Sequence, residues 1–270
     1  MKIKKLISAL VLGSMLAGFS GCNITDFSAE NLLRPPKAVG DEAEIEQLIA
    51  KTADSGYTLK YPKNGKFRSA IIMTDLDGND SNEAVAFFRN SAETSSVHML
   101  VMYSKDNSWE IASDNIFETT DIDSVDFADL TGNGKAEIIV NSTTYTPNVG
   151  KLSCYSYSEG KTNEVGSGQS CSSFVTGDFD NDGTSEIMSL VLYTTENEAL
   201  ASMLDYNEDS KSLYAKAMAN MDPNVVKYKN IAVTKLDNDI TGVVVDGTSA
   251  NEVTNTQVIF YSRDLAILRN

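Results

Sequence analysis

The chain has 270 residues, enough for one large domain or two small ones, and its hydrophobic content of 41% allows a packed core. The formal net charge of −16 argues against a nucleic-acid partner, because a protein needs a basic surface to bind phosphates. One histidine and three cysteines are a poor inventory for histidine-based catalysis or for a zinc site.

Residues 1–21 have the pattern of a secretory signal peptide. Three lysines stand among the first five residues, and an apolar stretch follows from Leu6 to about Leu16. The apolar stretch is too short to span a bilayer as a helix, which takes about 20 apolar residues. We therefore exclude residues 1–21 from the prediction of the fold.

Two small residues, Ser20 and Gly21, stand directly before Cys22. This arrangement resembles the bacterial lipobox, apart from Phe19, where leucine is commoner. The resemblance implies a lipid attached to Cys22, cleavage before that residue, and anchoring on the extracytoplasmic face of the cell membrane, which two or more acyl chains make stable. The alternative is an ordinary signal peptide with an incidental cysteine.

Residues 22–56 are predicted to form a tether and a short helix. The segment 23–40 is polar and contains Pro35-Pro36, as linkers do. From Asp41 to about Ala53, apolar residues recur at helical spacing after acidic residues, which predicts a short amphipathic helix with a solvated charged face.

Three segments of the remaining chain align without gaps: 71–88, 125–142 and 174–191. Each has an apolar strand, a nine-residue turn that starts on Asp and ends on Glu, and a second apolar strand. A fourth copy at 231–248 keeps the strands together with Asp237 and Asp239. It has Lys235 in place of the first Asp and Val243 in place of the last Glu. Internal repeats of this kind indicate a repeat architecture.

Between the turns, apolar and polar residues alternate as in half-buried strands. The predicted strand pairs are 98–103 with 108–112, 152–157 with 162–166, and 200–206 with 212–217. About four strands in about 50 residues is the size of one propeller blade. We therefore predict an all-β fold over residues 57–270, a β-propeller with about four four-stranded blades.

The acidic turns have the composition of Ca²⁺ sites, because Ca²⁺ takes six to eight oxygen ligands, many of them carboxylates. Side chains at positions 1, 3, 5 and 9 and the carbonyl at position 7 would point inward, while a glycine supplies the positive φ of the turn. The candidate ligands are Asp75, Asp77, Asn79, Ser81 and Glu83; Asp129, Thr131, Asn133, Lys135 and Glu137; and Asp178, Asp180, Asp182, Thr184 and Glu186.

The closing acid at position 9 and the flanking strands distinguish these turns from an EF-hand, and Mg²⁺ fits them less well. We expect turn 178–186, with four carboxylates, to bind most strongly and turn 75–83, with three, to come next. Turn 129–137 has two carboxylates and should bind more weakly, and the fourth copy should not bind. The alternative is an acidic β-turn without metal, since Asp, Asn and Gly favour turns for their own reasons.

The turns DLDGNDSNE and DFDNDGTSE between strands resemble FG-GAP/VCBS repeats, as in integrin-alpha-type propellers. Together with the lipobox, LLRPPK at 32–37 and the segment 57–79, the chain is similar to VCBS-repeat lipoproteins of Gram-positive anaerobes. The resemblance implies metal on the blade loops, an extracytoplasmic location and a binding role. Such propellers usually have seven blades, so we expect an incomplete chain forming an open arc, with a closed four-blade propeller as the alternative.

These patterns favour a non-enzymatic binding, scaffold or adhesion module, with a protein or a glycan as its ligand. The alternative is an enzyme acting on polysaccharide, or its accessory domain, which would need a pair of acids in a groove. Cys154 and Cys171 could form a disulfide in an exported protein, although a hairpin around Gly160 would place Cys154 nearer to Val165.

Overall fold

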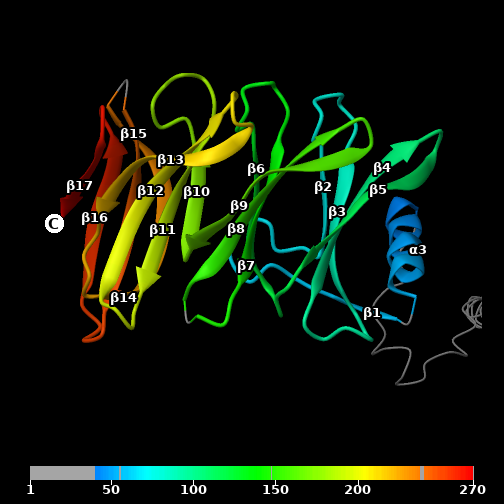
Figure 1. Ribbon diagram of the computed structural model, residues 1–270, viewed down its shortest axis with the longest axis horizontal. Coiled ribbons are helices and arrows are strands. Elements are labelled where there is room, and N and C mark those ends of the chain that lie inside the picture. The colour runs from blue at the N-terminus through cyan, green and yellow to red at the C-terminus, as the bar shows by residue number, and fades with distance from the viewer. Residues whose placement is uncertain (1–39, 55, 147, 238–239, 270) are drawn as a thin grey trace, which may run out of the picture. The chain divides into compact units, whose positions relative to one another are not determined.

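The computed structural model describes residues 40–270, apart from residues 55, 147, 238–239 and 270 (Figure 1). The predicted signal peptide, Cys22 and residues 23–39 of the tether lie outside the described residues. The described part contains one helix, α3 (Asp41–Ala53), at the predicted bounds, followed by strands only. No helix in this part is long and apolar enough to cross a membrane.

The strands form four antiparallel sheets, each made of consecutive strands. The first sheet contains β1 (Tyr57–Leu59), β2 (Ile71–Thr74), β3 (Glu83–Asn90), β4 (Val97–Lys105) and β5 (Ser108–Phe117). The second contains β6 (Ile122–Ala128), β7 (Glu137–Thr143), β8 (Gly150–Ser158) and β9 (Lys161–Cys171). The third contains β10 (Ser173–Gly177), β11 (Glu186–Tyr193), β12 (Glu198–Asn207) and β13 (Ser212–Asn220). The fourth contains β14 (Val225–Asp237), β15 (Ile240–Ser249), β16 (Thr254–Tyr261) and β17 (Leu265–Arg269).

This architecture confirms the all-β prediction and the strand pairs expected between the turns. The first sheet differs from the others because β1 and β2 share one edge of β3. Tyr57–Leu59 pairs with the end of β3, while Ile71–Thr74 pairs with its beginning.

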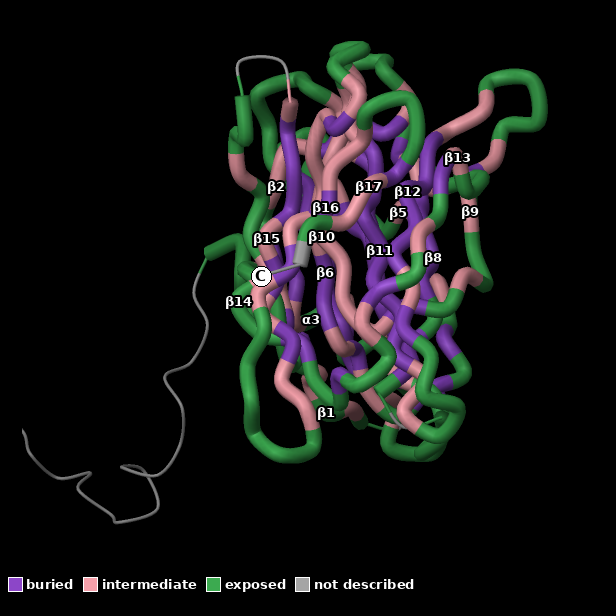
Figure 2. The backbone as a smooth tube through the Cα atoms, turned by 90° about the vertical axis from the view of Figure 1, so that its left-hand side faces the viewer, coloured by how far each residue is buried: buried purple, intermediate pink, exposed green. Residues whose placement is uncertain are grey.

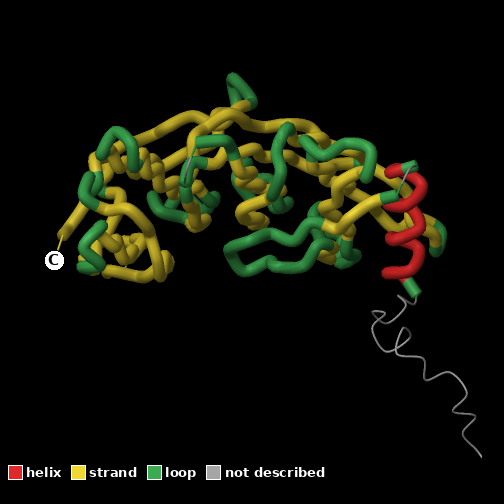
Figure 3. Tube along the Cα trace, turned by 90° about the horizontal axis from the view of Figure 1, so that it is seen from below, coloured by secondary structure: helices red, strands yellow, loops and turns green. Residues whose placement is uncertain are grey.

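The sheets stand side by side in chain order, and their facing sides form the core (Figures 1 and 3). One apolar cluster joins the first sheet to the second, another joins the second to the third, and a third joins the third to the fourth. The buried residues therefore run along the strands, and the exposed residues gather at the loops (Figure 2). The first and fourth sheets lie at opposite ends of this row, so the described residues do not form a closed four-blade propeller.

Helix α3 covers the face of the first sheet that is turned away from the second. Ile45 and Ile49 are buried and pack with Phe88, Leu100 and Trp109. Burying each isoleucine contributes about 1.5–3 kcal/mol to the packing of this short helix on the sheet. The acidic first turn stays exposed, as the sequence pattern predicts.

Cys154 and Cys171 are free and fully buried, so no disulfide links them. In the β8–β9 ladder, Cys154 lies opposite Gly166 and Cys171 lies opposite Gly150. The expected hairpin register is therefore correct, and it keeps the two sulfur atoms at different steps of the ladder.

Candidate metal sites

The three acidic turns occupy equivalent places, since each connects two neighbouring antiparallel strands: β2 to β3, β6 to β7 and β10 to β11. Neighbouring turns also touch. The Ala136 N–H donates to the Leu76 carbonyl at 3.0 Å, and the Ser185 N–H donates to the Asp129 carbonyl at 2.9 Å. The turns therefore form one connected series, in which the order of each turn supports the next.

The closing glutamate of each turn is buried and holds the start of the same turn. One carboxylate oxygen accepts a hydrogen bond from the backbone N–H at position 2, at 2.7–2.8 Å in all three turns. The residues at position 2 are Leu76, Leu130 and Phe179, each at most 2% exposed. The apolar side chain at position 2 packs in the core, and this packing places the backbone N–H of the same residue next to the glutamate.

The opening aspartate of each turn accepts hydrogen bonds from backbone N–H groups later in the same turn. Asp75 accepts from Gly78 at 2.8 Å and from Asp80 at 2.9 Å, and Asp129 accepts from Gly134 at 2.7 Å. The equivalent bond from Gly183 to Asp178 is longer, at 3.3 Å. Gly78, Gly134 and Gly183 all have positive φ, as the turn requires.

Two of the turns gather enough carboxylates to hold a metal ion. In turn 178–186, one ligand oxygen from each of the four acids lies within 4.8 Å of the others, and in turn 75–83 the same is true of the three acids. The clustered residues are Asp178, Asp180, Asp182 and Glu186, and Asp75, Asp77 and Glu83. In turn 129–137 position 3 is Thr131, which leaves only Asp129 and Glu137 as carboxylates.

Buried carboxylate oxygens without a hydrogen-bond partner occur in the two acid-rich turns. They are Oδ1 of Asp178, Oε1 of Glu186 and Oδ1 of Asp77. In turn 129–137 the Thr131 hydroxyl donates to Oε1 of Glu137 at 3.3 Å, so the matching oxygen has a partner. Leaving a buried acceptor unpaired is costly, and a cation bound between the carboxylates would remove that cost.

Burial, together with the neighbouring charges of Asp180 and Asp182, raises the pKa of Glu186 to about 8. Burial also raises the pKa of Glu83 and of Glu137. At Asp75 burial acts in the same direction, but the surrounding N–H donors outweigh it and lower the pKa. A positive charge in the turn would therefore stabilise the ionised form of the closing glutamates more than that of the other acids.

Lys216 on β13 reaches turn 178–186, a contact that the sequence analysis missed. Its ammonium group pairs with Asp180 and, at 2.8 Å, with Asp205 on β12. Burial opposes the ammonium charge, but hydrogen bonds to the two aspartates outweigh it and raise the pKa of Lys216. One oxygen of a candidate ligand is thus already held by a cation from another strand. No local sequence signal marks this pair, because the strand pairing creates it.

The fourth copy lacks the nine-residue turn. Strand β14 ends at Asp237 and strand β15 begins at Ile240. The connecting residues, Asp239 among them, lie outside the described residues. The Lys235 ammonium donates to the Thr241 hydroxyl at 2.8 Å. A lysine with a hydroxyl partner thus takes the place of the opening aspartate.

Comparison of the chain with protein-family models and with curated proteins finds no match. The resemblance to FG-GAP/VCBS repeats remains a prediction from the turn motif. The acidic clusters and their geometry are the observations on which a function can be based.

Proposed function

We propose that this protein is a Ca²⁺-binding module of FG-GAP/VCBS-type repeats that acts without catalysis, as a binding, scaffold or adhesion protein. The observation that carries the proposal is the pair of acid clusters with buried, unpartnered carboxylate oxygens. In this proposal Cys22 carries a lipid that holds the module on the extracytoplasmic face of the membrane.

The donor set supports Ca²⁺ over other common ions. Each acid-rich turn offers carboxylates and backbone carbonyls, with an amide from Asn79 in the first, and no nitrogen or sulfur ligand. Zn²⁺ and Cu²⁺ favour nitrogen and sulfur ligands. Mg²⁺ keeps several waters and demands octahedral geometry, whereas Ca²⁺ accepts an irregular cage of protein oxygens.

Binding would stabilise the fold, because the ion binds the folded turn and the unfolded chain does not hold the ligands in place around it. An ion present at 100 times its Kd adds about 2.7 kcal/mol per site. For a chain of this size that gain corresponds to a rise in Tm of roughly 5–10 °C. Because the Ser185 N–H donates to the Asp129 carbonyl, an ion that stabilises turn 178–186 would also stabilise the neighbouring turn of the second sheet.

The test is calorimetric unfolding of the mature protein with Ca²⁺ and with a chelator. We expect Ca²⁺ to raise the Tm, and Asp178→Ala to lose most of that rise. Asp209→Ala, in the exposed β12–β13 turn, is the matched control and should keep it. Absence of Ca²⁺ binding at millimolar concentration would contradict the metal site, and release of reducing ends from glycans would contradict the non-enzymatic role.

A further inference from the structure

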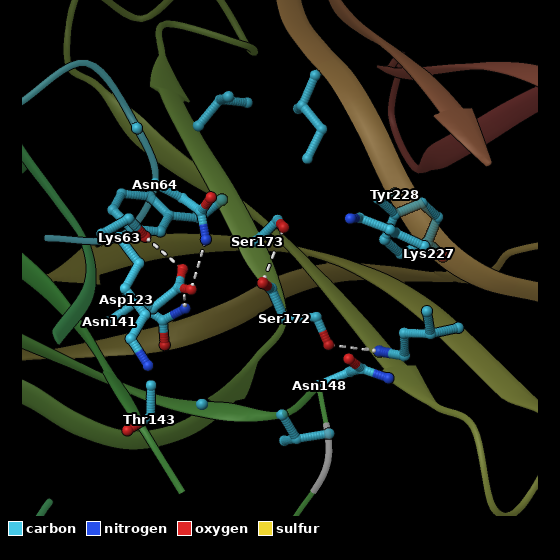
Figure 4. Close-up of a pocket in the computed structure, with 18 of the residues that line it drawn as sticks. Lys63, Asn64, Asp123, Asn141, Thr143, Asn148, Ser172, Ser173, Lys227 and Tyr228 are labelled. Carbon is cyan, nitrogen blue, oxygen red and sulfur yellow. Dashed lines mark hydrogen bonds between the residues drawn. The ribbon is translucent and has the colours of Figure 1, made fainter. Parts of the chain in front are cut away.

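A polar cleft lies along the first strands of the second, third and fourth sheets. These strands, β6, β10 and β14, are edge strands of their sheets, and the Thr176 hydroxyl of β10 donates to Asp126 of β6 at 3.0 Å. The cleft has a volume of about 1070 Å³, and segment 63–66 and the described residues of the β7–β8 loop complete its walls (Figure 4). None of the candidate metal ligands lines it. Its volume slightly exceeds that of most small-molecule sites, which span roughly 300–1,000 Å³.

The cleft is positively charged in a strongly acidic chain. Four lysines and two aspartates line it, a local net charge of +2, whereas the whole chain carries −16. Lys63 pairs with Asp121 and Lys66 pairs with Asp126. Lys227 and Lys229 on β14 are exposed and form no ion pair with any described residue. These two lysines are therefore available to attract an anionic ligand.

Across the cleft from Lys227, a group of polar side chains is held in place by hydrogen bonds (Figure 4). The Asp123 carboxylate accepts from the Asn64 amide at 2.8 Å and from the Asn141 amide at 3.4 Å. Asn141 is only 1% exposed, and its Oδ1 has no hydrogen-bond partner. Hydroxyl groups of Ser172 and Ser173 continue the polar wall. Such a wall both donates and accepts, as sugar hydroxyls also do.

We propose that this cleft binds an anionic glycan. Its hydroxyl groups contact the Asp123 and Asn64 side chains, while the buried Asn141 holds Asp123 in place, and its carboxylate or phosphate groups contact Lys227 and Lys229. A polyanion without hydroxyls would be repelled by Asp123, while a neutral glycan would leave the two lysines unused. The proposal rests on the function as a binding module and is independent of the metal sites.

The test is isothermal titration with four defined probes: hexagalacturonate, phosphorylated maltohexaose, neutral maltohexaose and a poly-glutamate peptide. We expect one of the two anionic glycans to bind, which also tells whether the charge is carboxylate or phosphate. Its affinity should fall as the salt concentration rises. The proposal is wrong if no probe binds at millimolar concentration, if maltohexaose binds as tightly, or if only the peptide binds.

The double variant Lys227→Glu/Lys229→Glu reverses the free charges at exposed positions and should weaken binding by about tenfold or more. The control variant Lys105→Glu/Lys161→Glu changes the net charge by the same amount at exposed hairpin positions away from the cleft. Its affinity for the glycan should stay within about twofold of the unchanged protein, because distant charges are screened. Equal losses in both variants would overturn the proposal.

Titration with the chelator present separates the two functions: glycan binding without a Ca²⁺ effect refutes the metal sites alone. A Ca²⁺ effect without glycan binding refutes the cleft alone.

Discussion

Turns 178–186 and 129–137 have the same length, lie between equivalent strands and each close on a buried glutamate, yet the partners of that carboxylate differ. In turn 129–137 the Thr131 hydroxyl donates to Oε1 of Glu137. In turn 178–186 position 3 is Asp180, and Oε1 of Glu186 has no partner. One turn is thus satisfied by its own side chains, while the other needs a cation or a proton. The side chains at positions 3 and 5, which are Thr131 and Asn133 in one turn and Asp180 and Asp182 in the other, separate a turn satisfied by its own side chains from a candidate metal site.

The largest effect should come from the apolar anchors that the two turns share. Phe179→Ala should lower the free energy of unfolding by about 3–5 kcal/mol and Leu130→Ala by about 2–5 kcal/mol, because each leaves a cavity in the core. Urea unfolding measures both losses. Val226→Ala, which is exposed, is the control. A loss below 1 kcal/mol at either anchor would contradict the role of position 2.

Thr131→Asp should convert the satisfied turn into an acid-rich one. Without metal the variant should lose about 1–3 kcal/mol of stability, because Oε1 of Glu137 loses its donor and gains a charged neighbour. With Ca²⁺ that loss should be recovered, and isothermal titration should detect an additional site. Thr131→Val removes the donor without adding a carboxylate, so it should be destabilised with and without Ca²⁺. Recovery in the Val variant would refute the explanation.

The pH dependence of the metal-free protein should separate the turns further. The pKa of Glu186 is raised to about 8 from an ordinary value of 4.5, so the folded state keeps a proton that the unfolded state releases. Its contribution to stability is present below about pH 4.5 and is lost as the pH rises to about 8. Unfolding in chelator should therefore show stability falling over this range, and Glu186→Gln should flatten the fall. Glu208→Gln, an exposed acid, should not change the slope.

The smallest effect concerns Lys216, which pairs with Asp180 in turn 178–186 only. Lys216→Met should tighten Ca²⁺ binding at that turn by about threefold or more, because the competing ammonium charge is removed. Lys161→Met, an exposed lysine on β9, should leave the affinity unchanged. Weaker binding in Lys216→Met would instead mean that the lysine positions Asp180 as a ligand.

The candidate ligands were predictable because a nine-residue turn is a local structure. Positions 1, 3, 5 and 9 lie within one short loop, so their spacing in the sequence largely sets their spacing in space. The bounds of α3 and the hairpins around Asp106 and Gly160 follow from equally local signals. The unpartnered oxygen of Glu186 was beyond such signals, because it depends on burial by neighbouring sheets.

By itself the sequence determined three hairpin pairs, the repeated turns, their graded carboxylate content and the amphipathic helix, since periodicity and turn chemistry act over a few residues. Only the tertiary structure decided that α3 covers the first sheet, that Cys154 and Cys171 stay apart, and that Lys216 reaches Asp180. It alone assembled the cleft, whose walls come from three sheets and from segment 63–66. Side chains so far apart in the chain meet only when sheets pack face to face, and packing depends on every sheet at once.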